Sequence, residues 1–495
     1  MLTDARSLKD GQRLEADVCI AGAGAAGITL ARSLVGSGLS VLLLESGGFE
    51  FDPATQQLYE GRVVGQDYWA LHTSRLRFFG GSTNHWTGWC RPLDPIDFEA
   101  RPNMLGGWPI DYEELLPYYS LAQSDCELDR FDYSAERWAQ RYRVRLIPLE
   151  DPAWETIVWQ FSPPTRFGDR YQDELITRDD VQVVTHANLV NIGVTSSGAH
   201  VDQFHVRVLD GPRLSVSANA FVLALGGLEN PRLLLASNDV VKAGVGNQRG
   251  VVGRYFSDHP HSVIGHIIMS DHYEETGYTG VHREGEGTFV RFSWALSDEA
   301  RRSLNMPGIS VTLDPLGTDA TNDDLRKIGV GSLMEQLAAQ RTKATYGLFL
   351  RAEQPPNASS RVRLGKTRDA LGVPRIELDW RVPHTLHDKV REAVKALAIT
   401  VGSHSIGRIL SFPHADTRPP NGWPTLWGGH HHLGTTRMSE DPRYGVVDRN
   451  CKVHGVDNLF CAGSSTFATA GYANPTLTIC ALARRLGEHL QERYS

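Results

Sequence analysis

The sequence has little cysteine and no long apolar run, and each absence narrows the classes of protein that it can encode. Only six of its 495 residues are cysteine, and no two of them form a Cys-x-x-Cys pair. A disulfide framework and a structural zinc site are therefore not expected, whereas a reducing compartment is. No apolar stretch reaches the ~18 residues that span a bilayer, and residues 1–15 lack the apolar core of a secretory signal. We expect a cytoplasmic protein with no membrane span, with export alongside a signal-bearing partner as the alternative.

An excess of positive charge is also absent. The formal net charge is −8, whereas nucleic-acid binding selects basic surfaces, so no nucleic-acid partner is expected. The mild negative charge slightly favours a cationic small molecule. Glycine, by contrast, is abundant, with 48 residues, and this suits close approach of the backbone to a large cofactor. The length and composition indicate a soluble enzyme with more than one folding unit.

A dinucleotide-binding fingerprint follows the first predicted strand, residues 17–21. Gly22, Gly24 and Gly27 have the spacing G-x-G-x-x-G and lead into a predicted helix, and the acidic Glu45 closes the next apolar strand. The first glycine permits a tight turn, the second lets a pyrophosphate touch the backbone, and the third lets helix and strand pack closely. Glu45 would accept hydrogen bonds from ribose hydroxyls. The motif predicts a Rossmann-type unit but does not separate NAD from FAD.

Later segments favour FAD over NAD. They are residues 77–86 (RFFGGSTNHW), 225–232 (LGGLENPR), 431–438 (HHLGTTRM), 458–465 (NLFCAGSS) and 471–478 (GYANPTLT). In this order, and together with the fingerprint, they resemble the glucose–methanol–choline (GMC) oxidoreductase family over about residues 16–490. Within it the chain is most similar to the branch of pyranose oxidase and bacterial glycoside dehydrogenases. His85-Trp86 follows the double glycine, and Asn474-Pro475 stands where glucose oxidase has a second histidine.

The resemblance implies a fold that combines α/β and α+β architecture. It consists of a Rossmann-type FAD-binding domain and a substrate domain with a large antiparallel sheet and helices. Strands over 308–313 and 360–364 and an amphipathic helix over 386–401 are predicted from the residue pattern. The assigned ranges are 1–100, 186–260 and 426–495 for the FAD-binding domain, and 101–185 and 261–425 for the substrate-binding domain.

The resemblance also implies which residues meet the cofactor and the substrate. Alcohol oxidation needs a base for the hydroxyl proton while the hydride leaves for flavin N5, and a neutral imidazole suits that task. His431 matches the family's base, and Asn474 matches the residue that orients the same oxygen. No metal site is expected, because the consecutive side chains of residues 430–432 diverge and no carboxylate has metal-ligand spacing. The residues assigned to FAD are Gly22, Gly24, Gly27, Glu45, Gly80, Gly81, Ser82, Asn84, His85, Trp86, Gly463, Ser464, Asn474, Pro475 and Thr476.

Two of these residues carry more specific expectations. His85 occupies the position that bears covalent FAD in pyranose oxidase, so attachment and simple contact are both open. Pro475 suits the first position of a helix whose positive end would favour reduced flavin. The segment Asp258-His259-Pro260-His261 has a catalytic interpretation, but a loop that closes the FAD site is preferred.

We therefore expect an FAD-dependent oxidoreductase that oxidises an alcohol group of a sugar, glycoside or amino sugar to a carbonyl. The alternatives are a non-sugar alcohol oxidase or dehydrogenase of the same family, and a lyase that keeps FAD without redox chemistry. An NAD-dependent dehydrogenase is opposed by the later motifs. The electron acceptor is open among oxygen, a quinone and a cytochrome.

Overall fold

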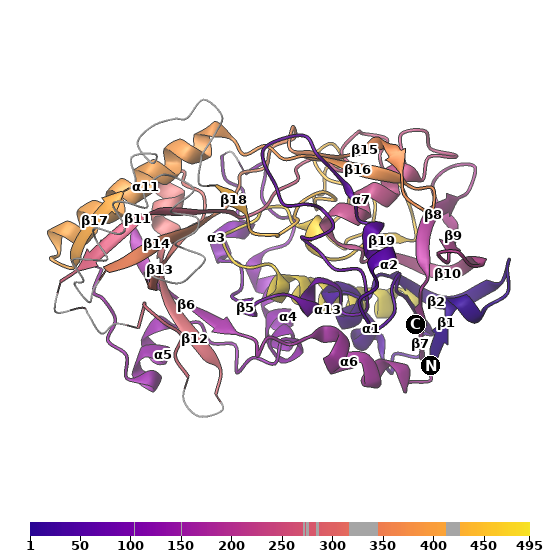
Figure 1. The fold of residues 1–495 in the computed structure, drawn as a ribbon, viewed down its shortest axis with the longest axis horizontal. Coiled ribbons are helices and arrows are strands. Elements are labelled where there is room, and N and C mark those ends of the chain that lie inside the picture. Colours follow the sequence, from indigo (N-terminus) through magenta and orange to yellow (C-terminus); the bar gives the residue numbers. More distant parts are fainter. Residues whose placement is uncertain are drawn as a thin grey trace.

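The computed structural model describes residues 1–102, 104–149, 151–270, 273, 277–283, 287–315, 345–411 and 426–495. Residues 316–344 and 412–425 of the predicted substrate-binding domain lie outside these ranges. Figure 1 shows an elongated molecule with one large sheet at each end of its long axis, and both chain termini at the same end. No described helix is long and apolar enough to cross a membrane.

The first large sheet has a parallel centre. Strands β7, β3, β2 and β10 run parallel in that order, and helices α1 (Ala25–Leu34) and α13 (Thr476–Tyr494) pack against each other beside it. The full order is β1-β7-β3-β2-β10-β9-β8, with β19 also paired to β10. The bounds are β1 (Leu2–Asp4), β2 (Arg13–Ala21), β3 (Val41–Leu44), β7 (Val181–Thr185), β8 (Asn188–Val194), β9 (Val201–Arg207), β10 (Arg213–Leu223) and β19 (Leu459–Cys461).

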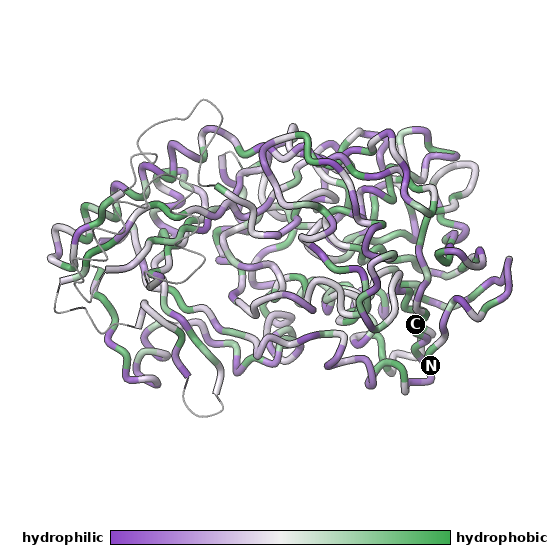
Figure 2. The backbone as a smooth tube through the Cα atoms, viewed as in Figure 1, coloured by the Kyte–Doolittle hydropathy of each residue, from purple (hydrophilic) through white to green (hydrophobic). Residues whose placement is uncertain are grey.

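The sequence explains why this centre is parallel. Residues 18–21, 41–44 and 220–223 are continuous apolar runs, and all of them are buried. Strands buried on both faces need such runs, and helical crossovers such as α1 supply the cover. Figure 2 shows hydrophobic residues concentrated along these strands, while hydrophilic residues occupy the outer turns.

The second large sheet is antiparallel throughout. Its order is β17-β11-β14-β13-β12-β6-β5, with β18 also paired to β11. One face packs under α11 (His384–Ser403), whose Val390, Val394 and Leu397 enter the core of this part of the molecule. The bounds are β5 (Trp89–Cys90), β6 (Trp154–Phe161), β11 (Pro260–Met269), β12 (Phe289–Leu296), β13 (Ile309–Pro315), β14 (Thr345–Ala352), β17 (Gly407–Ser411) and β18 (Trp427–Gly428).

A small third sheet, β15-β16-β4, lies beside helix α7 and the first large sheet. Its strands are β4 (Gly61–Val63), β15 (Arg361–Arg368) and β16 (Pro374–Asp379). The remaining α-helices of the described residues are α2 (Pro53–Gln57), α3 (Pro95–Phe98), α4 (Tyr112–Asp125), α5 (Ala135–Tyr142), α6 (Phe167–Ile176), α7 (Gly226–Ala236) and α8 (Asp298–Ser303). Short 3-10 turns are η1 (Ala5–Ser7), η2 (Gly81–Asn84) and η4 (Ser464–Thr466).

The predicted strands at 308–313 and 360–364 and the helix at 386–401 are confirmed as β13, β15 and α11. Three strands lie outside their expected units. Two of them, β5 and β18, come from ranges assigned to the FAD-binding domain but pair in the second sheet. The range 101–185 was assigned to the substrate-binding domain, yet β7 pairs with β3 in the first sheet, because its valines form another buried apolar run. The division into two domains stays a prediction.

Two buried features recur below. All six cysteines are buried free thiols: Cys19, Cys90, Cys126, Cys451, Cys461 and Cys480. The second feature is an ion cluster around Arg301 of α8, whose side chain is fully buried. Arg301 pairs with Asp97 of α3 and lies 3.5 Å from the carboxylate of Glu353, at the end of β14. The cluster therefore ties the second sheet to the segment that follows β5.

Candidate active site

One cavity collects segments that are far apart in the chain. It lies between the first large sheet and the loops that carry the predicted catalytic residues. Its lining includes residues 22–26, 45–46, 74–77, 81–83, 85–88, 224–229, 429–432, 463–464 and 474–476. Of the predicted site residues, all line this cavity except Gly27, Gly80 and Asn84.

The three glycines of the fingerprint have different surroundings. Gly22 has φ +104°, and a Cβ there would lie 2.6 Å from the carbonyl oxygen of Ala224. A Cβ on Gly27 would lie 1.8 Å from the carbonyl oxygen of Gly22, so α1 packs directly on the turn. Gly24 faces the cavity and has no atom within 4 Å of that position. The turn therefore leaves its backbone open to a large ligand at Gly24.

Glu45 stands at the end of β3, beside this turn. Its carboxylate accepts hydrogen bonds from the backbone N–H groups of Ala23 (2.9 Å) and Gly47 (3.0 Å). Burial raises its pKa, although these hydrogen bonds oppose the rise. Each carboxylate oxygen has a further lone pair, so Glu45 can also accept hydroxyl groups from the cavity.

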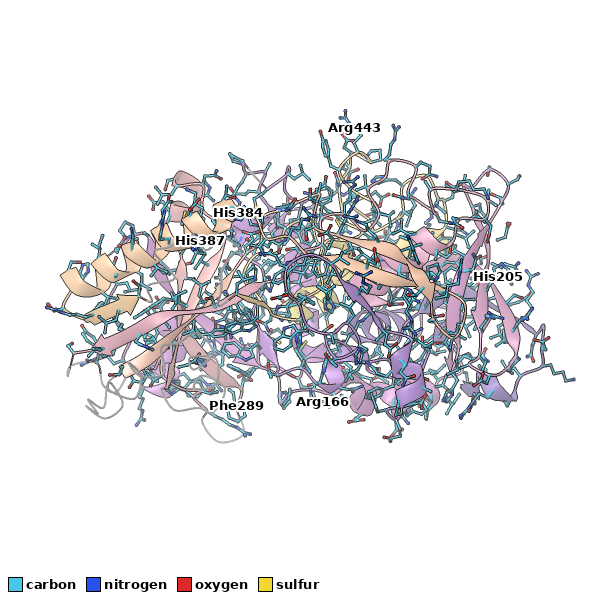
Figure 3. All side chains as sticks on the ribbon, turned by 45° about the horizontal axis from the view of Figure 1, so that its top comes forward. Arg166, His205, Phe289, His384, His387 and Arg443 are labelled. Atoms are coloured by element: carbon cyan, nitrogen blue, oxygen red, sulfur yellow. The ribbon has the colours of Figure 1, made fainter. Side chains whose placement is uncertain are left out.

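The double-glycine motif forms η2 next to the fingerprint. A Cβ on Gly81 would lie 3.1 Å from Cα of Gly24, so a larger residue would crowd the two turns. Arg166, labelled in Figure 3, donates to the carbonyl oxygens of Thr83 and Trp86 and holds this segment in place. Trp86 also donates from Nε1 to a backbone oxygen.

Two residues of this motif are turned away from the cavity. Gly80 has φ +95° and shapes the turn, and its N–H donates to the carbonyl oxygen of Ala23. Asn84 donates from Nδ2 to the carbonyl oxygen of Phe79 at 2.9 Å. Neither residue is among those that line the cavity, because both build the turn, and their contact with FAD stays a prediction.

The predicted base lines the same cavity as the fingerprint. Nδ1 of His431 is 2.7 Å from Nδ1 of His259, and Nε2 of His431 is 3.4 Å from the amide nitrogen of Asn474. Nε2 of His259 is 3.1 Å from the carbonyl oxygen of Ala470. The structure thus brings the two predicted catalytic residues together and adds a second histidine.

Asp258 holds the backbone around this pair. Its Oδ1 accepts N–H groups from His259 (2.6 Å), Gly429 (3.1 Å) and His431 (3.0 Å), and its Oδ2 accepts the hydroxyl of Tyr68. The interpretation of residues 258–261 as a loop that closes the FAD site is therefore wrong in part. Pro260 is instead the first residue of strand β11. Proline is tolerated at this position, because its missing N–H costs the sheet no hydrogen bond there.

Burial keeps the histidines of this region uncharged. It lowers the pKa of His431 well below the ordinary value, and the neighbouring His259, His261 and Arg351 lower it further. Burial also lowers the pKa of His259 to about 4. For Asp258, burial raises the pKa to about 7 despite four hydrogen bonds to the carboxylate. The imidazoles are therefore neutral at neutral pH.

Sequence reasoning also missed a buried ionic group in the cavity wall. Glu229 pairs with Arg75 (2.8 Å) and Arg232 (2.9 Å), and Arg232 pairs with Asp369 (2.7 Å). The opposite charges lower the pKa of Glu229 to about 2. Glu229 and Arg232 belong to a quoted motif, but nothing in it identifies their partners. In the described ranges no group of three histidine, cysteine or carboxylate side chains has a metal-binding arrangement.

Comparisons with known proteins agree with the family resemblance that the sequence motifs indicate. Residues 356–483 match the family model described as GMC oxidoreductase. The large subunit of fructose dehydrogenase from Gluconobacter japonicus is 25% identical, over 96% of this chain and 98% of its own. A 2-methyl-1,2-propanediol dehydrogenase from Mycolicibacterium austroafricanum is 24% identical, over 97% and 96%.

The solved structures add the fold. Pyridoxine 4-oxidase from Mesorbium loti superposes with a TM-score of 0.60 at 18% identity, over 96% of this chain and 98% of its own. These findings confirm the resemblance drawn from the motifs, the predicted fold class and the assignment to FAD-dependent oxidoreductases.

Proposed function

We propose that this protein, whose residues 356–483 match the GMC oxidoreductase family model, oxidises an alcohol group of a sugar, glycoside or amino sugar to a carbonyl. The observation that carries the proposal is the contact of His431 with Asn474 in the wall of the cavity that the dinucleotide fingerprint also lines. The relative named fructose dehydrogenase supports a sugar as substrate.

The residues of the cavity fit FAD. Gly24 offers an open backbone, Gly22 and Gly463 have positive φ in adjoining turns, and Glu45 can accept hydroxyl groups. When bound, FAD supplies the acceptor for the hydride that leaves the alcohol carbon. His85 lines the same cavity and is exposed within it, so we include covalent attachment through His85 as part of the proposal.

Hydrogen bonding determines which nitrogen of His431 takes the proton. A carbonyl oxygen only accepts, so the contact with Ala470 requires N–H at Nε2 of His259. Neutral His259 then has a free lone pair at Nδ1, which accepts the Nδ1–H of His431. His431 is left with an unprotonated Nε2 beside Asn474, and this nitrogen removes the hydroxyl proton of the substrate.

Asn474 and the helix behind it complete the arrangement. Oδ1 of Asn474 is buried and has no hydrogen-bond partner among the described residues, so it can accept the hydroxyl that His431 deprotonates. Pro475 is the N-cap residue of α13, which begins at Thr476. The free N–H groups and the positive end of this helix therefore stabilise negative charge at this end of the cavity.

The test is His431→Ala in the FAD-loaded protein. Anaerobic mixing with a panel of sugars, glycosides and amino sugars should bleach the flavin absorbance of the wild type. Removal of a positioned base typically costs about 10²–10⁴-fold in rate, so the variant should bleach at least 100-fold more slowly with FAD still bound. His205→Ala is a matched control, because His205, labelled in Figure 3, lies on β9 and is not among the residues that line the cavity. Wild-type bleaching by His431→Ala would assign the role to another residue.

A non-sugar alcohol is the second candidate substrate. The relative named 2-methyl-1,2-propanediol dehydrogenase covers nearly all of this chain, and small diols and aromatic alcohols therefore belong in the same panel.

The electron acceptor is tested separately with oxygen, a quinone and a cytochrome. We also propose a cytoplasmic location, which the six unpaired cysteines support.

A further inference from the structure

The second large sheet has two unlike faces. On β14, Arg351 lies directly opposite His261 of β11 and Ser310 of β13, and residues opposite each other across a sheet share a face. The neighbouring Leu350 and Val311 point the other way and join the apolar core under α11. Arg351 therefore lies on the polar face.

This polar face is the one turned toward the candidate active site. The ring centre of His261 is 6.0 Å from that of His431, and His259, two residues earlier, contacts His431 directly. Trp159 of β6, on the same face, packs in the core that the first sheet forms. The charge of Arg351 also lowers the pKa of His431, which places the guanidinium within electrostatic reach of the proposed base.

Arg351 is a buried cation without a carboxylate. The residue is 7% exposed, and among the described residues its side chain makes no ion pair or hydrogen bond. Asp314, the acidic residue that acts on it electrostatically, is paired with Arg291. Cζ of Arg351 lies 4.3 Å from the ring centre of Trp89 and 4.7 Å from that of Phe349. Stacking of this kind compensates only part of the cost of burying a charge.

Other buried arginines show what is missing. Arg232 pairs with Glu229 and Asp369, and Arg301 pairs with Asp94 and Asp97. Arg437, which is buried without a carboxylate, instead donates to backbone carbonyl oxygens. Each of these guanidiniums therefore has partners, because an unpaired buried charge is strongly unfavourable. A ligand that carries negative charge would give Arg351 the partner that the described part of the chain does not supply.

Uncharged polar groups on the same face also lack partners. Native proteins leave few buried polar atoms unsatisfied, so a cluster of them on one face indicates a polar ligand. Within the described ranges, the buried atoms without a hydrogen-bond partner on this face include Nη1 of Arg351, Oγ of Ser310, Oγ of Ser293, Nε1 of Trp159 and Nε2 of His261.

We propose that Arg351 binds a carboxylate of the substrate, so that the molecule oxidised is an acidic sugar such as a uronate. This rests on the proposed function, and it reverses the weak expectation of a cationic amino sugar drawn from net charge. One free guanidinium matches one carboxylate in charge and in its planar fork. A phosphate, with up to two charges, would call for a second free cation, and the nearby Arg291 is already paired with Asp314.

The experiment compares matched ligands in the holoenzyme. Glucuronate and galacturonate, their uronamides, the parent glycosides, glucosamine and glucose 6-phosphate are titrated by calorimetry into His431→Ala, which is not expected to turn them over. At least one uronate should bind about 10–100-fold more tightly than its amide, as expected for hydrogen bonds to a charged group. Arg351→Met, which keeps a stem to pack against Trp89, should remove this preference, and Arg351→Lys should restore part of it.

The outcomes separate this proposal from the proposed function. Equal binding of uronates and uronamides overturns the role of Arg351, and this comparison needs no variant at position 351. Tighter binding of glucose 6-phosphate overturns the carboxylate assignment. Flavin bleaching by neutral glycosides with no effect of Arg351→Met leaves the proposed function standing alone. Uronate binding that depends on Arg351, without bleaching by any sugar, leaves only the present inference.

Discussion

At the scale of single residues, the contact between two imidazoles is the feature with most consequence. His259 and His431 approach to 2.7 Å through their Nδ1 atoms, so one of these nitrogens carries the proton and the other accepts it. If both rings were protonated, two N–H groups would face each other in a buried site. The contact therefore favours the one arrangement of protons in which Nε2 of His431 is free to act as a base.

The pH dependence of the reaction should follow from this burial. An ordinary histidine base would lose activity as the pH falls through about 6.5. Because burial lowers the pKa of His431 well below that value, the imidazole stays unprotonated, and the rate of flavin bleaching should not fall tenfold for each pH unit below 6.5. Stopped-flow measurements on both sides of this pH, with denaturation monitored in parallel, check it. An acid limb centred at 6.5 would show that His431 titrates as an exposed histidine.

Replacement of His259 should change the base without removing it. His259→Phe deletes the acceptor for Nδ1–H of His431, so both tautomers become populated and the rate should fall by up to about tenfold, as one hydrogen bond implies. His259→Asn, which offers a carbonyl oxygen, should recover part of the loss. A merely structural role would change stability but leave the pH profile of the reaction as in the wild type, and that result would remove His259 from the proton arrangement.

The sequence identified His431 and Asn474 because each lies in a motif with a family meaning. It did not identify His259, because its partner is 172 positions away in the chain, and the tetrapeptide around it has no spacing that indicates a base. Asn84 was assigned to the cavity from its place in a motif. The direction of its side chain depends on a local hydrogen bond to Phe79, which residue spacing does not reveal.

At the scale of elements, the turn between β2 and α1 separates two functions of glycine. Gly24→Ala should leave the fold intact, since its Cβ would meet no protein atom within 4 Å. The substitution should weaken the binding of FAD, because that position faces the cavity. Gly27→Val should destabilise the protein by about 1–3 kcal/mol, since its Cβ would overlap the carbonyl oxygen of Gly22. Chemical denaturation and FAD titration of both variants distinguish the effects.

Gly402→Ala is the control for these substitutions. Gly402 lies in α11, has no atom within 4 Å of a new Cβ, and has no positive φ. Alanine should be neutral or stabilising there. If Gly24→Ala and Gly27→Val had the same effect on FAD and on stability, the distinction between cofactor contact and packing would be wrong.

Elements with strong local patterns were predictable, and elements that depend on distant pairing were not. Helix α11 follows from its apolar spacing, and β2 and β3 follow from apolar runs on either side of a glycine turn. β11 begins at Pro260, although the sequence predicted a loop there, since proline and histidine have weak strand preference. Its pairing with β14 and β17 becomes visible only in the folded chain.

At the scale of the whole molecule, a buried ion cluster around Arg301 ties the second large sheet to the segment that follows β5. Arg301→Met should leave the buried Asp97 without the cation that donates to it, and Glu353 with Arg101 alone. Breaking a buried pair by removing one partner typically costs about 3–5 kcal/mol, and that loss should appear in chemical denaturation. Arg302→Met is the control, because its ion pair with Glu99 is exposed. An equal loss in both variants would mean that the buried cluster does not hold the second sheet to the segment that follows β5.

The overall architecture could be predicted only where motifs carried it. The Rossmann-type centre and the antiparallel second sheet were expected from the family resemblance. The place of β7 in the first sheet was not expected. Val181–Thr185 is followed directly by β8, β9 and β10 of the same sheet, and no change in composition marks a domain boundary before β8. The sheet that a strand joins depends on which other strands leave an edge unpaired, and this is set only when the whole chain folds.

The burial of all six thiols has a practical consequence for electrochemistry. Maleimide reagents need an accessible thiolate, so a single cysteine introduced on the surface would be the one site that they modify quickly. Thr87 is exposed and lines the cavity, and Thr87→Cys would carry a tethered redox mediator at its rim. Immobilised on an electrode, such a conjugate would turn substrate oxidation directly into a current.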